Sequence, residues 1–374
     1  MTEKKIRVGV CFGGRSGEHE VSLLSARSVL ANLDTNRYEI TQIAITHEGQ
    51  WFCGANALES LNRGSVADLE RVLLLAEPGD HYLYTLRGTD GNFHLEKRTE
   101  LDVIFPVLHG TFGEDGTLQG LLELNGIAYV GAGVLGSAVG MDKGLFKQVM
   151  RANNLPVLDW SIIDRSQVEK DIQAVIDACE AVGPYPLFTK PANLGSSVGI
   201  TKCRTRSDLM EGLMEACRYD RRILVEKGLS NPREIEASVL GNDQPQAALP
   251  GEVIPGEDFY TYSAKYLSDN SQLVIPAPLP ESVIDEIRRI AVAAYKVIDC
   301  AGMARVDFLL DRQTLAIYLS EVNTIPGFTK ISMYPKLWEA SGLKYSALLD
   351  RLIELALERK GDRDRTEFVY RRNA

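Results

Sequence analysis

Hydrophobic residues in this chain fall in short runs, and glycine-rich or charged segments separate them. Near the N-terminus an apolar run at residues 6–12 ends at the glycine-rich segment 13–17, and a helical pattern follows over residues 18–33. A strand, a glycine turn and a helix in this order open a doubly wound α/β unit, in which the helix N-terminus can hold an anionic or zwitterionic ligand. Residues 50–100 show no clear pattern and are expected to be irregular. Further elements of the unit are expected at strands 38–46, 103–108 and 128–130 and at helix 118–125.

The second half of the chain continues with short strands and amphipathic helices. Residues 251–275 combine glycine, proline and aromatic residues without periodicity, and a long loop inside a compact domain is usually functional. The charged residues 360–374 are expected to fray. Strands are expected at residues 157–163, 187–192, 200–203, 223–229 and 233–240, and helices at 145–153, 167–182, 283–298 and 345–358.

Two apolar runs, residues 305–310 and 315–323, flank a polar tetrad and predict an antiparallel hairpin. Because side chains alternate between the faces of a strand, one face should carry three oxygen-bearing side chains and a guanidinium, those of Asp307, Glu321, Asn323 and Arg305. Most of the other residues of both runs are apolar, on both faces, so these carboxylates should be buried and need a partner. That partner is either a divalent ion, for which oxygen ligands favour magnesium, or Arg305 in an internal salt bridge.

Residues 193–199 lie between two expected strands and include two glycines and two serines. Such a loop can fold over phosphate groups, and Lys190 on the preceding strand is a well-placed point charge. An ordinary flexible hairpin is the alternative. The chain contains no GxxxxGK motif followed by Ser or Thr, which excludes a P-loop enzyme.

Two other features have competing interpretations. A GxGxxG pattern at residues 131–136, with Asp159 further on, is typical of a nicotinamide or flavin site. It follows several strands instead of opening the first unit, which makes this the weaker interpretation. His109 comes at the carboxyl end of an expected strand, where ligands bind in open α/β sheets; the alternative is a loop histidine bonded to the backbone.

The composition restricts the class of protein. With 374 residues the chain should form two or three domains. A net charge of -10 argues against a nucleic-acid binder, and no apolar run approaches the ~20 residues of a membrane span. The six cysteines have no CxxC spacing and are expected to be buried, reduced thiols of a cytoplasmic protein.

Eight stretches, in order along the chain, carry a family resemblance: GGRSGEHEVSLLSA, VLHGTFGEDGTLQG, MDK, KPANLGSSVGI, VEKGL, AKYLSD, GMARVDFLL and EVNTIPGFTKISMYP. On these motifs the chain resembles D-alanine:D-alanine ligases of the ATP-grasp superfamily. The resemblance implies an α/β fold (α+β overall), in which an N-terminal doubly wound parallel-sheet domain precedes two ATP-grasp subdomains. The implied boundaries are 1–140, 141–230 for the central ATP-binding subdomain, and 231–374 for the catalytic subdomain, whose lid loop is 257–270.

The implied activity is the ATP-dependent joining of two D-alanine molecules through a D-alanyl phosphate. The products are ADP, phosphate and the D-alanyl-D-alanine that bacteria use as a peptidoglycan precursor. A ligase forming the D-alanyl-D-lactate ester, or another ATP-grasp amino-acid ligase, is the alternative. A non-catalytic nucleotide-binding protein with the same fold is a further one. The resemblance also implies a cytoplasmic homodimer that binds D-alanine and ATP, and neither nucleic acid nor membrane.

The resemblance assigns residues to each ligand. Two Mg²⁺ (or Mn²⁺) ions would be held by Asp307, Glu321 and Asn323. ATP would be bound by Lys143, Lys190, Gly195, Ser197, Glu226, Lys227, Leu229 and Glu234. The two D-alanine molecules would meet Glu18, His109, Ser196, Lys265, Tyr266, Arg305, Gly327, Ser332 and Met333. Among these, Glu18 would hold the first ammonium, Arg305 and Gly327 the oxyanion, and Ser332 and Met333 the second carboxylate.

Two variants follow from these assignments. Gly195→Ala should damage ATP use more than stability, because alanine resists backbone conformations that glycine adopts. Tyr266, hydrogen-bonded to Ser196 and Glu18, is expected to select an amine over a hydroxyl nucleophile. Tyr266→Phe should therefore increase ester formation with D-lactate. Gly144 and Thr189 depart from the family pattern without removing a ligand.

Overall fold

The apolar runs near the N-terminus form the parallel centre of a sheet. In the computed structural model, which describes residues 4–89, 91–254 and 272–369, β1 (Ile6–Gly13) lies between β2 (Tyr38–Ile45) and β7 (Val103–Val107), and both pairings are parallel. β7 pairs in parallel with β8 (Ala128–Tyr129). Residues 8–13 of β1 are all buried, as expected of a strand covered on both faces. The helices of this part are α1 (His19–Asn32), α2 (Ala57–Asn62), α3 (Thr117–Asn125) and α4 (Val134–Met141).

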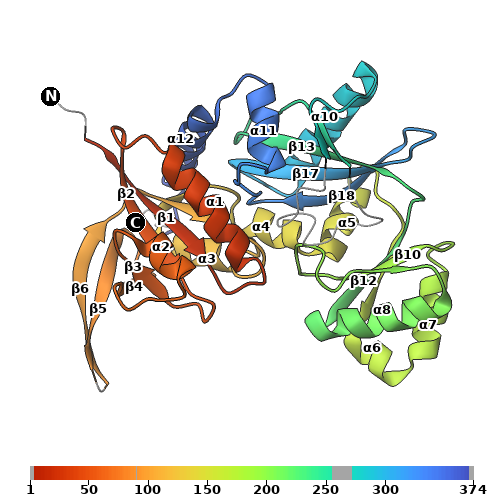
Figure 1. Cartoon of the computed structure of the whole chain (residues 1–374), viewed down its shortest axis with the longest axis horizontal. Coiled ribbons are helices and arrows are strands. Elements are labelled where there is room, and N and C mark those ends of the chain that lie inside the picture. The colour runs from red at the N-terminus through yellow and green to blue at the C-terminus, as the bar shows by residue number, and fades with distance from the viewer. Residues whose placement is uncertain (1–3, 90, 255–271, 370–374) are drawn as a thin grey trace, which may run out of the picture.

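Residues 50–100 are not irregular, so that expectation was wrong. They extend the same sheet with four antiparallel strands, in the order β6-β5-β4-β3-β2-β1-β7-β8 over the described residues. Most of β6 is exposed, which removes the alternation of apolar and polar residues that marks a half-buried strand. Figure 1 shows the β5–β6 hairpin projecting from the body of the molecule. The added elements are β3 (Trp51–Cys53), β4 (Glu70–Leu74), β5 (Tyr82–Thr89) and β6 (Asn92–Glu100).

A second sheet has the order β11-β10-β12-β9 within the part of the chain that the structure describes. Its strands are β9 (Trp160–Asp164), β10 (Leu187–Pro191), β11 (Thr201–Cys203) and β12 (Arg222–Lys227). The single helix expected over 167–182 is two helices, because Asp171 interrupts it and its side chain caps the second by accepting from Ala174 N. The helices are α5 (Lys143–Ala152), α6 (Arg165–Lys170), α7 (Ile172–Glu180) and α8 (Arg206–Tyr219), the last not expected.

The third sheet contains the expected hairpin. Its described strands run in the order β16-β15-β13-β17-β18, and β14 pairs with β13. They are β13 (Arg233–Leu240), β14 (Gln246–Ala247), β15 (Gly251–Ile254), β16 (Gln272–Val274), β17 (Met303–Leu310) and β18 (Ile317–Asn323). The helices are α10 (Glu281–Val297), α11 (Met333–Ala340) and α12 (Tyr345–Arg363). α12 continues to Arg363, so the expectation of fraying was wrong for residues 360–363, and residues 370–374 lie outside the described part of the chain.

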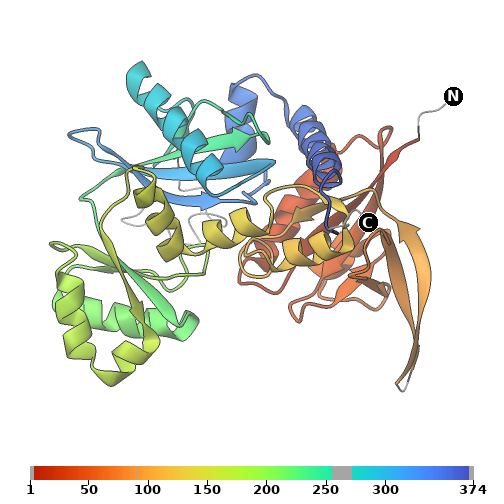
Figure 2. The same cartoon turned by 180° about the vertical axis from the view of Figure 1, so that it is seen from behind.

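The three sheets form three lobes that meet around α4 and α5 (Figures 1 and 2). The chain returns at its end to the first lobe, where α12 lies against β7 and β8. The glycines at the two ends of the 131–136 pattern allow close packing against residues 299–302. A Cβ on Gly136 would lie 3.0 Å from the carbonyl oxygen of Asp299, and a Cβ on Gly302 would lie 3.0 Å from Gly131 N. The GxGxxG pattern thus has a packing explanation.

Candidate active site

Two pockets adjoin where the three lobes meet, and Lys143 and Glu321 line both of them. Lys143 begins α5, and its Nζ lies 3.9 Å from Glu321 Oε2 on β18. It also donates to the carbonyl of Leu194, at 2.6 Å. The first pocket includes Glu18, His109, Gly195, Ser196, Arg305, Asn323 and Gly327. The second includes Lys190, Ser197, Glu226, Lys227, Leu229, Glu234 and Asp307.

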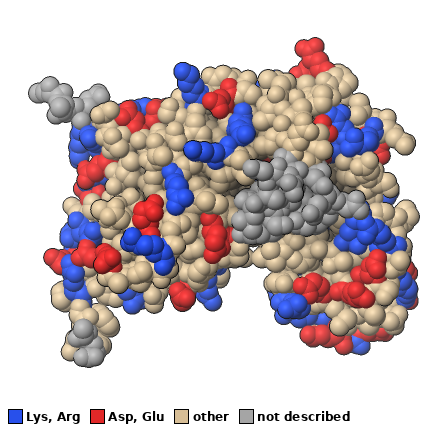
Figure 3. Space-filling model, in the orientation of Figure 1, with Lys and Arg blue, Asp and Glu red and all other residues tan. Residues whose placement is uncertain are grey.

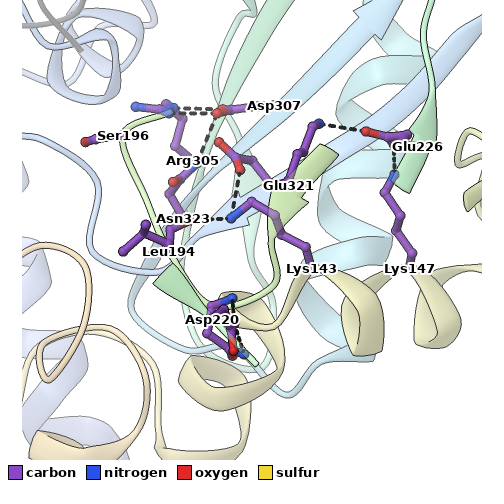
Figure 4. Close-up of polar contacts among 12 residues, drawn as sticks. Lys143, Lys147, Leu194, Ser196, Asp220, Glu226, Arg305, Asp307, Glu321 and Asn323 are labelled. Atoms are coloured by element: carbon purple, nitrogen blue, oxygen red, sulfur yellow. Dashed lines mark hydrogen bonds and ion pairs between the residues drawn. The ribbon is translucent and has the colours of Figure 1, made fainter. Parts of the chain in front are cut away.

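The hairpin of β17 and β18 brings the expected polar side chains together. Arg305 pairs with Asn323 and Asp307 with Glu321 across the strands, and a bulge follows Asp307. Arg305 donates to both oxygens of Asp307, from Nε and Nη2 at 2.7 Å each, and Asn323 Nδ2 donates to Asp307 Oδ2 at 3.0 Å. The structure therefore contains the internal salt bridge that the sequence left as an alternative to a metal (Figure 4).

The chemistry of this face also fits a divalent ion that binds together with its nucleotide. Magnesium is commonly held by one or two carboxylates plus phosphate oxygens rather than by an all-protein cage. Asp307 and Glu321 supply two carboxylates, and no group of three or more His, Cys, Asp or Glu suited to a metal occurs among the described residues. The residues present thus fit magnesium shared with phosphates, and not a protein-only metal site.

Glu18 and Ser196 join the first lobe to the loop after β10. Both side chains are buried, and Ser196 Oγ donates to Glu18 Oε1. A Cβ on Gly195 would come within 2.5 Å of Glu18 Oε2, so the loop can approach this closely only with glycine there. Gly195→Ala would therefore disturb Glu18 as well as the loop.

His109 is buried with both ring nitrogens engaged. Nδ1 lies 3.0 Å from the carbonyl oxygen of Ile325, and Nε2 lies 3.0 Å from Ser25 Oγ. Burial lowers the pKa of His109, which favours a neutral ring that donates to Ile325 and accepts from Ser25. The ring lines the first pocket and bonds the backbone carbonyl of Ile325; its role toward a ligand stays a prediction.

Glu114 belongs to the first pocket, and the sequence analysis did not single it out. Its two carboxyl oxygens accept from Gly110 N at 2.8 Å and from Ile325 N at 3.0 Å. Burial, and then the charge of Glu18, raise its pKa to about 8. Its place next to Asp115 in a glycine-rich loop was the available signal, but sequence alone does not tell which of the two acids turns inward.

The 193–199 loop connects the antiparallel strands β10 and β11, as predicted. Ser196, Ser197 and Gly199 all have left-handed backbones, with φ of 53°, 61° and 70°. Turns of this kind can direct several backbone N–H groups toward one anion. A Cβ on Gly199 would lie 2.7 Å from the Tyr219 ring, so glycine is needed at that position for space as well.

Glu226 lines the second pocket and contacts two lysines, of which Lys147 is labelled in Figure 4. Lys190 Nζ lies 2.6 Å from its Oε2, and Lys147 Nζ is in contact with its Oε1. Burial alone would raise the pKa of Glu226, but the two ammonium charges hold that pKa below its usual value. Lys147 is a second residue that the sequence analysis missed; it lies one helical turn after Lys143 on α5.

Of the remaining predicted residues, Gly327, Ser332 and Met333 are described by the structure. A Cβ on Gly327 would lie 2.7 Å from Ser332 Oγ, and Met333 begins α11, so these three are neighbours. Ser332 and Met333 are not among the described residues that line the two pockets. Lys265 and Tyr266 lie outside the described residues.

Family comparisons cover almost the whole chain. The model for the D-ala D-ala ligase N-terminus matches residues 7–132, and the model for the D-ala D-ala ligase C-terminus matches residues 149–354. A D-alanine--D-alanine ligase from Natranaerobius thermophilus is 49% identical over 367 residues, which is 97% of this chain and 98% of that one. The chain belongs to the D-alanine--D-alanine ligase family.

Solved structures of the family support the same fold. The D-alanine-D-alanine ligase from Coxiella burnetii is 38% identical, with a TM-score of 0.81 and 96% of each chain covered. The VanG D-Ala:D-Ser ligase from Enterococcus faecalis is 34% identical, with a TM-score of 0.82, covering 94% of this chain and all of that one. The expected α/β ATP-grasp fold and the resemblance to this ligase family are thereby confirmed.

Proposed function

We propose that this enzyme of the D-alanine--D-alanine ligase family joins two D-alanine molecules and converts ATP to ADP and phosphate. The observation that carries the proposal is the pair of adjoining pockets with Lys143 and Glu321 on both. One pocket suits amino acids and the other a nucleotide, so the γ-phosphate and the first carboxylate can meet at the shared wall. That carboxylate attacks the γ-phosphate to give D-alanyl phosphate, and the amine of the second D-alanine then displaces phosphate.

In the nucleotide pocket, charge and backbone amides would hold ATP. Lys143 and Lys190 would neutralise phosphate oxygens, and the left-handed 196–199 turn would cover them with backbone N–H groups. Glu226, together with the backbone of Lys227 and Leu229, would hold adenine, and Glu234 the ribose hydroxyls. Asp307, Glu321 and Asn323 would hold two Mg²⁺ (or Mn²⁺) ions. Bound there, these ions would neutralise negative charge on the phosphates.

In the amino-acid pocket, Glu18 would pair with the first ammonium while Ser196 fixes its carboxylate. Arg305 would stabilise the oxyanion that forms at the attacked carbon, with the backbone of Gly327. Arg305 is anchored for this by Asp307 and by Glu236, whose Oε2 lies 3.1 Å from Arg305 Nε. Ser332 and Met333 would meet the carboxylate of the second D-alanine.

The proposal extends to the oligomeric state and the cellular location of the protein. We expect a homodimer in the cytoplasm, supplying dipeptide for peptidoglycan. All six cysteines are free thiols, and five of them are buried. None of the described helices is both long and apolar enough to cross a membrane. On the face drawn in Figure 3, basic and acidic side chains are interspersed.

Phosphate release from ATP tests the proposal. Release should require D-alanine, with L-alanine as the matched control, and mass analysis should find D-alanyl-D-alanine. D-serine and D-lactate offered together with D-alanine measure the choice of second substrate. Phosphate release without dipeptide, or an ester as the main product, would overturn the proposed reaction.

A further inference from the structure

A buried lysine, Lys147, and a partly buried one, Lys190, share one carboxylate at the edge of the nucleotide pocket. The side chain of Glu226 is 3% exposed and that of Lys147 is 1% exposed, so both groups are almost fully enclosed. The side chain of Lys190 is 15% exposed and lines the pocket. Among the described residues, Lys147 lines neither pocket, so it would act on a nucleotide only through Glu226.

The two lysines differ in what they can do. Lys190 is on β10, next to the 193–199 loop, and can turn its ammonium into the pocket toward phosphate. When it does so, Glu226 loses its contact with Lys190. A buried carboxylate without a partner is costly, and breaking one side of a buried pair is usually strongly unfavourable. Lys147, enclosed against Glu226 from α5, removes that cost because it stays in place.

We propose that Lys147 is a positioning residue, a permanent counter-ion that keeps Glu226 charged and fixed while Lys190 moves from Glu226 to the nucleotide phosphates. The inference rests on the proposed function, because it assumes that the second pocket binds a nucleotide. Figure 4 shows Lys147 against the Glu226 carboxylate, whose other oxygen contacts Lys190. The sequence motifs do not identify it, since Lys147 falls on a helix and pairs across to β12.

The test compares ADP with adenosine in Lys147→Met, which keeps the length of the side chain and removes its charge. In this variant Lys190 must remain with Glu226, so ADP should bind about tenfold or more weakly by calorimetry. Adenosine has no phosphate and needs no such movement, so its affinity should change much less. Arg151→Met, on the same helix but in an exposed pair with Asp159, is the matched control and should leave both affinities unchanged.

A second pair of variants isolates the role of Glu226. Glu226→Gln has no carboxylate to neutralise, so adding Lys147→Met to it should change ADP affinity by less than about twofold, whether or not the single Lys147→Met variant folds. A tenfold loss on this background, or equal losses for ADP and adenosine in Lys147→Met, would overturn the inference. If the wild-type chain binds ADP but makes no dipeptide, the proposed reaction fails while the role of Lys147 stands on the binding data.

Discussion

At the scale of single residues, Glu321 tests the site most directly because it lies on the wall shared by both pockets. Glu321→Gln keeps the shape of the side chain and removes its charge, which weakens both a hard-metal ligand and the partner of Lys143. We expect phosphate release to fall by about a hundredfold or more, with an unchanged circular dichroism spectrum.

The matched control for Glu321→Gln is Asp311→Asn, at the turn of the same hairpin. Within the part of the chain that the structure describes, Asp311 accepts from residues of the turn itself, Gln313 and Thr314, and it should be dispensable for turnover. Near-normal phosphate release by Glu321→Gln at ordinary magnesium concentrations would remove the hairpin from the proposed metal site.

Glu114 should make stability depend on pH. Its pKa is raised to about 8 in the folded chain, whereas an unfolded glutamate titrates near ~4.3. Its contribution to stability is therefore fully present below the unfolded pKa and is lost as pH rises toward 8, because only the unfolded chain releases the proton in that range. We expect the free energy of unfolding in urea to decline between about pH 5 and 8, and Glu114→Gln to flatten that decline. An equal decline in Glu114→Gln and in the exposed control Glu59→Gln would exclude this role.

The sequence identified residues by type and spacing but not by partner. Asp307, Glu321 and Asn323 were predictable because strand periodicity fixes which residues share a face. The sequence could not decide whether Asp307 pairs with Arg305 or with a metal ion, since both satisfy a carboxylate. Lys147 and Glu114 were missed because their partners come from distant segments of the chain.

At the scale of elements, Asp142 joins α4 to α5 and thereby positions Lys143. Its Oδ1 accepts from Leu145 N at 2.8 Å, which caps α5, and its Oδ2 pairs with Arg222 on β12. Asp142→Ala should lose about 1 kcal/mol from the cap alone, and more with the ion pair. We expect a lower melting temperature by calorimetry and a higher KM for ATP.

Asp142→Asn separates the two contributions, because asparagine can still cap the helix but carries no charge for Arg222. It should fall between the wild type and Asp142→Ala in melting temperature. If Asp142→Ala has the same melting temperature as the wild type, the cap does not stabilise the junction of α4 and α5.

The elements that could be predicted from the sequence have a clear periodicity of hydrophobic residues or are bounded by glycines. The β17–β18 hairpin and the β1–α1 unit are of this kind. β6 was missed because most of it is exposed and it is held by pairing with β5 and by surface ion pairs such as Arg87 with Glu96. β5 was missed because its buried residues, 83–85, are consecutive and show no alternation. α8 was missed although Thr205 and Asp208 form a capping box at its start, a signal that sequence alone contains.

At the scale of the whole molecule, one hydrophobic core contains residues of two expected units, 1–140 and 231–374, whose boundaries stay a prediction. This core contains Val8 and Val103 from the first sheet and Leu348 and Leu352 from α12. Polar contacts follow the same path: Tyr38 donates to Asp350 Oδ1 at 2.7 Å, and the Arg359 guanidinium lies 4.2 Å from the centre of the Tyr129 ring. The end of the chain therefore completes the fold of its beginning.

This arrangement predicts that residues 1–140 do not fold stably alone. Four α12 side chains are fully buried in that core, Leu348, Leu349, Leu352 and Ile353. Their burial stabilises the fold by roughly 6–12 kcal/mol as an upper estimate, which is comparable with the whole stability of a domain. A fragment of residues 1–140 should unfold without a cooperative urea transition, and the same fragment joined to residues 341–369 by a glycine-serine linker should regain one. If the fragment alone unfolds cooperatively at the midpoint of the linked form, α12 adds little to the first sheet and residues 1–140 are an independent domain.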